Sequence, residues 1–188
     1  MLVRYNMQVR FYQAQAPVFC QLGCMSDLVR HFRIFLSSPS DVPEERQIAR
    51  EVIKQLQCEP QFRDRVSLEA VAWDEPGAGT PMLATKSPQA AIDEGLPTPA
   101  DCDIVVVIFW ARMGTPLPYP EYKKYNGDPY NSGAEWEFEN ATQGHRLHKR
   151  PEVMVYRRME KVLLDDEATD YEHKLAQKRL VKSSSINL

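Results

Sequence analysis

Hydrophobic positions along this chain fall into short continuous runs separated by longer stretches with helical spacing. The strongest run is Ile104 to Trp110, where every residue is apolar and most are β-branched or aromatic. The run is too short to span a membrane, and it lacks the polar alternation of a strand with one wet face. Strands that are covered by helices on both faces have this pattern, and they belong to parallel sheets. We therefore predict a central, buried strand here.

Other elements alternate on either side of this strand. Apolar runs predict three further strands, at residues 32–36, 66–73 and 153–156. Helical signals predict helices after Asp41, near residues 88–94, from Ser132 to about His148, and in a charged tail at 165–182. Joined by right-handed crossovers, this order gives a flavodoxin-like, three-layer α/β/α fold with a parallel sheet of four to five strands in the order 2-1-3-4.

The first predicted helix carries two detailed expectations. Asp41 and Glu44, with Pro43 between them, have the spacing of a capping box, so we expect the Asp41 side chain to cap the helix. Apolar residues then recur at helical spacing and predict one buried stripe, formed by Ile48, Ala49, Val52, Ile53 and Leu56.

The two ends of the chain differ from the middle. Residues 1–25 carry no periodic apolar face, so we expect a disordered extension that packs little against the domain. Residues 26–160 form the predicted α/β domain, and residues 161–188 form a C-terminal helical tail.

Composition excludes several classes of function. The formal net charge is −3, and no basic stripe is present, so we expect no nucleic-acid partner. The four cysteines are scattered without paired spacing, which predicts no metal site and fits reduced thiols in the cytoplasm. The sequence has no P-loop, no G-x-G-x-x-G cofactor motif and no nucleophile elbow, and we expect neither a bound cofactor nor a membrane anchor.

Three segments carry a family resemblance. They are F-L-S-S-P-S-D-V-P-E-E-R (35–46), D-C-D-I-V-V-V-I-F-W-A-R-M-G-T-P (101–116) and S-G-A-E-W-E-F-E-N-A (132–141). Together they resemble a bacterial domain of unknown function that is a divergent relative of the TIR (Toll/interleukin receptor) domain. That family usually stands ahead of NTPase or repeat modules, so the resemblance implies such modules as downstream partners.

The resemblance also implies an activity and a site. Enzymatic TIR domains cleave the nicotinamide–ribose bond of NAD with a glutamate on the helix after the third strand, and Glu137 matches that glutamate best. Glu135 and Glu139 are the alternatives. For substrate binding we expect residues in the two exit loops that flank the switch-point crevice of the sheet: Ser37, Ser38, Ser40, Trp110 and Arg112.

Chemistry supports a carboxylate in that role, because cleavage of a ribosyl N-glycosidic bond builds positive charge on the sugar. The competing interpretation is that the three glutamates are solvent-facing charges near a helix start, where the macrodipole favours acids. Three functions stay open at this point. The chain is an enzyme of prokaryotic signalling or defence that hydrolyses NAD or a related nucleotide, a self-associating TIR-type interaction module, or a nucleoside deoxyribosyltransferase-like enzyme.

Overall fold

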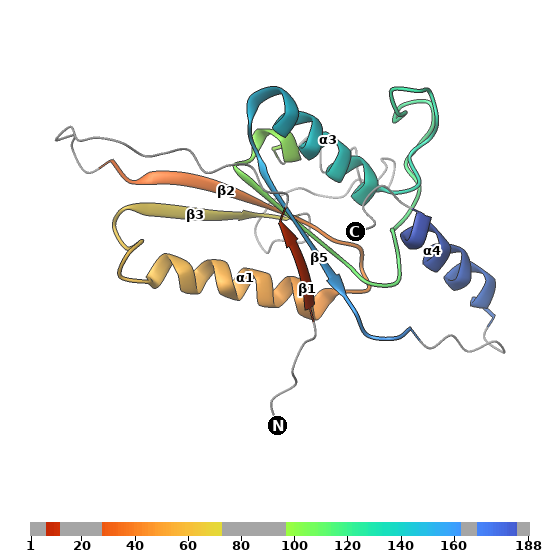
Figure 1. Ribbon diagram of the computed structural model, residues 1–188, viewed down its shortest axis with the longest axis horizontal. Helices are drawn as coiled ribbons and strands as arrows, with labels where there is room; N and C mark the ends of the chain where they lie inside the picture. The colour runs from red at the N-terminus through yellow and green to blue at the C-terminus, as the bar shows by residue number, and fades with distance from the viewer. Residues whose placement is uncertain (1–6, 12–27, 73–96, 163–168, 184–188) are drawn as a thin grey trace, which may run out of the picture.

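Five strands form one sheet in the order β1-β5-β4-β2-β3 (Figure 1). The structure is a computed structural model that describes residues 7–11, 28–72, 97–162 and 169–183. The strands are β1 (Met7–Phe11), β2 (Arg30–Ser37), β3 (Val66–Val71), β4 (Ile104–Phe109) and β5 (Glu152–Arg158). The helices are α1 (Pro43–Cys58), α3 (Gly133–His148), α4 (Tyr171–Ser183) and the short 3-10 helix η1 (Pro99–Asp101).

Four of these strands are parallel, as the sequence predicts. β2 pairs with β3 on one side and with β4 on the other, and β4 pairs in turn with β5, all in parallel. The order of the parallel strands is therefore 2-1-3-4, which is the flavodoxin-like order.

The N-terminal segment differs from the expectation where the structure describes it. Met7–Phe11 was expected within a disordered extension, but it forms β1, which pairs antiparallel with β5. The segment M-Q-V-R-F alternates apolar and polar residues, a pattern typical of strands, and a fifth strand covers the otherwise unpaired backbone edge of β5. The other residues of the expected extension lie outside the described part of the chain.

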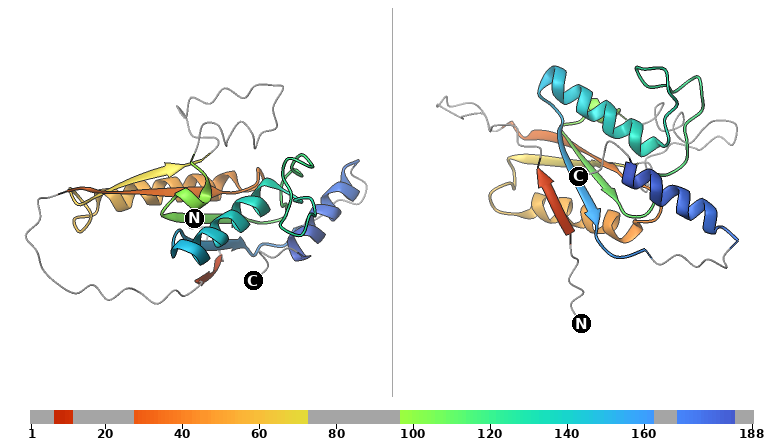
Figure 2. Two further views of the ribbon diagram at one scale, coloured as in Figure 1. Left: turned by 90° about the horizontal axis from the view of Figure 1, so that it is seen from above. Right: turned by 45° about the vertical axis from the view of Figure 1, so that its right-hand side comes forward.

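The helices cover both faces of the sheet, as Figures 1 and 2 show. On one face, α3 and α4 contribute Phe138, Ala141 and Val181 to a cluster with alternate residues of the strands, including Phe35 and Val107. On the other face, α1 contributes Ile53 to a second cluster. Its strand residues alternate along the chain with those of the first cluster: Ile34, Leu36, Leu68, Ala70, Ile104 and Val106. This alternation assigns each strand residue to the α3 face or to the α1 face.

The central strand is buried as predicted. Val105, Val107, Ile108 and Phe109 are all buried, and β4 lies in the middle of the sheet. Strand β3 ends at Val71, two residues before the predicted end.

The expected capping box of α1 is wrong. The helix has Val42 as its N-cap, and no side chain caps it. The Asp41 carboxylate instead accepts a hydrogen bond from the backbone N–H of Ala111, 3.0 Å away in the loop that leaves β4. The hydrogen bond from Ala111, far along the chain, therefore engages the Asp41 carboxylate that the local spacing predicts as the cap of α1.

The apolar stripe of α1 is only partly buried. Ile53 is in the core and Ala49 packs against it, but Ile48, Val52 and Leu56 are 41%, 45% and 39% exposed. The helix turns these three residues away from the sheet, so part of the predicted core face is surface.

One further expectation, the short helix near residues 88–94, lies outside the described residues. Among the helices that the structure describes, none has the length and apolar character needed to cross a membrane.

Helix α3 approaches η1 closely at Gly144. A Cβ at this position would lie 3.0 Å from Ala100 Cβ and 3.3 Å from both Ala100 Cα and the carbonyl oxygen of Arg150. Gly144→Ala gains about 1 kcal/mol of helix propensity, but the crowding against backbone atoms costs about 1–3 kcal/mol.

We therefore expect Gly144→Ala to lower the free energy of unfolding, measured by urea denaturation, although alanine is the better helix former. Adding Ala100→Gly removes the closest contact and should restore part of the loss. A Gly144→Ala protein more stable than the wild type would contradict the close packing of α3 on η1.

Candidate functional site

Two loops leave the carboxyl ends of the neighbouring strands β2 and β4 and are tied together. Asp41 in the first loop accepts a hydrogen bond from Ala111 N in the second. Arg112 in the second loop donates from Nη1 to Ser40 Oγ, 3.2 Å away. Crevices at this edge of open α/β sheets are where ligands bind, and the structure therefore brings Ser40 and Arg112 together at the expected place.

A buried arginine shapes the first loop. Arg46 in the first turn of α1 is buried, and its Nε donates to Ser38 Oγ at 2.7 Å. Its Nη2 donates to the carbonyl oxygen of Pro39 at 2.8 Å. The hydroxyl of Ser38, a predicted binding residue, thus accepts a hydrogen bond from within the protein and stabilises the loop.

Ser37 differs from Ser38. It lies two residues after Phe35, so its side chain belongs to the α3 face of the sheet. Its hydroxyl is buried and has no hydrogen-bond partner. Buried polar atoms without partners are rare in native structures, so this hydroxyl is available to a ligand or a water.

Unpartnered buried atoms concentrate at this edge. In the part of the chain that the structure describes, four buried side-chain atoms lack a hydrogen-bond partner: Ser37 Oγ, Asp41 Oδ1, Glu45 Oε2 and Arg112 Nε. All four belong to the last residue of β2, the exit loops of β2 and β4, or the first turn of α1. Buried polar atoms without a partner in the described protein thus lie together near the switch point, where the strand order of the sheet reverses.

Glu137 lies on the sheet-facing side of α3. It is only 6% exposed, and it precedes by one helical turn Ala141, a residue of the core cluster. The loop from β4 leads into the start of α3, and Gly144 near the end of the helix lies against η1, which precedes β4, so the helix begins at the carboxyl edge of the sheet. Glu137 and Ser37 therefore share one face of the sheet at the same edge.

The alternatives Glu135 and Glu139 lie on a different side of α3. The Glu135 carboxylate is buried and fully engaged: it accepts hydrogen bonds from Lys124 Nζ and from the Asn131 backbone N–H, both at 2.8 Å. Glu139 is partly exposed, 3.9 Å from Lys124 Nζ. None of the three glutamates is simply a solvent-facing charge.

The start of α3 agrees with the sequence. Ser132 is its N-cap, and Ser132 Oγ accepts a hydrogen bond from Glu135 N at 3.0 Å. Tyr130 precedes this cap. Burial raises its pKa to about 12, and the charge and hydrogen bonding of Glu139 act in the same direction. The Tyr130 hydroxyl is therefore protonated at neutral pH.

Trp110 is not brought together with Glu137. The guanidinium of Arg158 lies 4.3 Å from the centre of its ring, and Arg158 also donates to Glu45 on α1 at 3.0 Å and to Glu160. The indole N–H of Trp110 donates to the carbonyl oxygen of Glu160. These contacts tie Trp110 to the end of β5 and, through Arg158, to Glu45 of α1.

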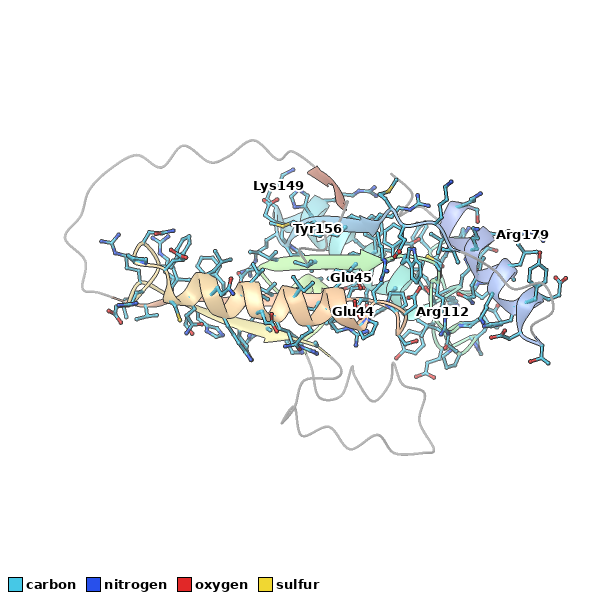
Figure 3. The ribbon with its side chains drawn as sticks, turned by 90° about the horizontal axis from the view of Figure 1, so that it is seen from below. Glu44, Glu45, Arg112, Lys149, Tyr156 and Arg179 are labelled. Carbon is cyan, nitrogen blue, oxygen red and sulfur yellow. The ribbon has the colours of Figure 1, made fainter. Side chains whose placement is uncertain are left out.

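Figure 3 shows Glu45 and Arg112 at the arrowhead end of β4, whereas Lys149 lies toward the other end. Sequence reasoning missed three charged residues that build this edge, namely Glu45, Arg46 and Arg158. Glu45 and Arg46 follow a proline in a charged helix start, a pattern that normally indicates solvent exposure. For Arg158 the one available signal in the sequence was the adjacent pair of arginines, Arg157 and Arg158, at the end of β5.

Metal and thiol chemistry find no support among the described residues. No group of three His, Cys, Asp or Glu side chains is placed there to hold a metal ion. Cys102 is buried in the core, and burial, the largest effect, raises its pKa to about 12, which keeps it an unreactive thiol.

No protein family, curated protein or solved structure matches this chain. The structure itself establishes the fold: a flavodoxin-like α/β protein with four parallel strands. The fold class is therefore shown, but no family is, and the TIR-like resemblance stays a prediction from the sequence.

The engaged carboxylate of Glu135 predicts a structural role. Glu135→Gln places an amide NH₂ among donors from Lys124 and Asn131, so we expect it to lower the free energy of unfolding by about 2 kcal/mol. Glu139→Gln, one turn away and partly exposed, should change it by less than about 0.5 kcal/mol. Thermal or urea unfolding measures both, and equal effects of the two substitutions would contradict the assignment.

Proposed function

We propose that this domain hydrolyses the N-glycosidic bond of NAD or a related nucleotide, with Glu137 as the catalytic carboxylate. The observation that carries the proposal is the burial of Glu137 on the sheet-facing side of α3, at the edge where Ser37 keeps a buried, unpartnered hydroxyl. Burying a carboxylate is costly, and such groups are frequent at functional sites.

The chemistry requires a carboxylate close to the ribose. As the bond between ribose C1′ and the nicotinamide nitrogen breaks, positive charge develops on the sugar, and a nearby carboxylate stabilises it. Water then adds its oxygen to C1′ and releases a proton. The products are nicotinamide and ADP-ribose.

The switch point offers groups for the rest of the substrate. Ser37 Oγ at the end of β2 and Arg112 Nε in the exit loop of β4 are buried and unpartnered. Arg46 and Ser38 hold the first loop in shape, and Trp110 receives no role at the ribose.

The TIR-like resemblance of residues 35–46, 101–116 and 132–141 supports the same function. It implies nucleotide cleavage by a glutamate in the position of Glu137, within a signalling or defence protein with downstream NTPase or repeat modules. The four-stranded parallel sheet agrees with that resemblance, although a fold alone hosts many functions.

One observation favours a second candidate, a self-associating interaction module. Ile48, Val52 and Leu56 recur at every fourth position of α1 and are each about two-fifths exposed, so they form an apolar surface stripe. A second copy of this chain would bury that stripe in an α1–α1 contact, in keeping with the self-association that the TIR-like resemblance implies.

Glu137→Gln tests the main proposal. The amide keeps the shape of the side chain but removes the negative charge that a cationic ribosyl transition state requires. We expect the rate of nicotinamide release from NAD to fall about a hundredfold or more, equivalent to about 3 kcal/mol. Release is followed by chromatography with the protein concentrated or clustered.

Glu139→Gln is the matched control, because it removes the same charge from the same helix and should leave the rate within a few-fold of wild type. Loss of activity in Glu139→Gln with full activity in Glu137→Gln would move the catalytic role to Glu139. If no preparation cleaves NAD or a nucleoside, and sedimentation shows a dimer that Val52→Glu dissociates, the interaction module is the function.

A further inference from the structure

A groove runs along α3, between this helix and the turn at residues 123–130 in the chain that leads into it (Figure 1). Its volume is about 970 Å³, near the upper end of the range of small-molecule sites. The groove extends to Glu152 and Val153 at the start of β5. Glu137 and Ser37 do not line it, so it is distinct from the site proposed for the ribose.

Aromatic side chains from both walls line this groove. Phe138 belongs to the hydrophobic core and Val153 packs against that core, so the two give the groove an apolar floor. Tyr130 and Trp136 are half-buried, and Tyr125 is fully exposed. Aromatic side chains present flat faces on which another ring can stack.

The turn that carries Tyr125 is closed by its own hydrogen bonds. Lys124 N donates to the carbonyl oxygen of Asp128 at 2.8 Å, and Gly127 N donates to the carbonyl oxygen of Lys124 at 2.9 Å. Gly127 has a φ of 90°, a conformation that favours glycine. The position of the exposed Tyr125 ring is therefore set by the turn and not by a contact of the ring itself.

Helix α3 anchors this turn with a buried acid. Glu135 is 3% exposed and accepts a hydrogen bond from Lys124 Nζ at 2.8 Å. Next to it, the rings of Tyr122 and Trp136 meet edge to face with their centres 5.9 Å apart. Burying a carboxylate is costly, and here the buried carboxylate fixes one wall of the groove against the other. A wall that is in place before a ligand arrives loses little conformational entropy on binding.

The lining carries no excess of either charge. With histidine counted as neutral, Lys123 and Arg146 stand against Glu139 and Glu152, so the formal charges cancel. Such a lining gives a charged ligand no general advantage. It also contains two neutral hydrogen-bonding side chains, the hydroxyl of Thr142 and the amide of Gln143.

We propose that this groove binds a planar, uncharged nitrogen heterocycle of the nucleobase class, which stacks on the rings of Tyr125, Tyr130 and Trp136. Such a ligand has flat faces for the aromatic side chains and donors and acceptors at its edge for Thr142 and Gln143. The inference is independent of NAD cleavage and holds whether or not Glu137 is catalytic.

NMR titration of the wild-type protein with adenosine tests the proposal, because adenosine joins an uncharged base to a sugar. Adenosine should bind saturably and shift the indole N–H signal of Trp136, which Trp136→Phe identifies. Ribose, the probe without the base, should leave that signal in place. AMP should bind within a few-fold of adenosine, since the balanced lining does not select its phosphate.

Tyr125→Ala is the sharpest variant, because this side chain is fully exposed and its removal leaves the packing of the domain unchanged. Loss of one stacking surface should weaken adenosine binding about tenfold. Tyr119→Ala is the matched control. Tyr119 is an exposed tyrosine of the same loop that does not line the groove, so its loss should leave the affinity unchanged.

Three results would overturn the proposal. The first is adenosine that does not bind or that leaves the Trp136 signal unmoved. The second is an equal loss of affinity in Tyr125→Ala and Tyr119→Ala, which would indicate unspecific stacking on exposed rings. The third is AMP that binds more than about tenfold tighter than adenosine, because the phosphate and not the base would then be recognised. Adenosine contains no nicotinamide bond, so failure of the proposed hydrolysis would leave these outcomes unchanged.

Discussion

Burial of β4 on both faces is the constraint from which the rest of the structure follows. A strand without a polar residue from Ile104 to Phe109 needs cover on each side, and α1 supplies one layer while α3 and α4 supply the other. Its parallel neighbours β2 and β5 then end at the same edge. The loops that leave β2 and β4 satisfy polar groups against each other there, as Asp41 and Ala111 do.

Charged groups are buried mainly at this crowded edge. Glu45 and Arg46 are buried in the first turn of α1, and Glu137 is buried in the second turn of α3. Buried charges cost stability unless they are paired, and replacing them with apolar residues is often neutral or stabilising. Glu45 and Arg46 are paired, with Arg158 and with the first loop respectively. The unpartnered atoms at the same edge are easier to explain by a ligand than by folding, which supports a binding site at the carboxyl ends of the strands.

Long-range order in the fold was predictable from the sequence because it rests on hydrophobic periodicity. The apolar run of β4, the order of the four parallel strands and the start of α3 at Ser132 all appear as predicted. Predictions from local spacing were wrong where distant residues take part. Asp41 accepts a hydrogen bond from Ala111 and does not cap α1, and Arg158 stacks on Trp110. No one-dimensional pattern reveals such partners. The edge strand β1 was missed because its pairing depends on the open edge of β5, from 143 to 151 residues further along the chain.

The central claim is that nucleotide binds on the α3 face at the carboxyl edge of the sheet. Titrating ¹⁵N-labelled Glu137→Gln protein with NAD tests it most directly, because the substrate then binds without being consumed. The account predicts amide shifts that gather at Ser37 and in the first two turns of α3, with the α1 stripe of Ile48, Val52 and Leu56 unchanged. Saturating NAD that moves no signal in these segments, or moves only the α1 stripe, would contradict it.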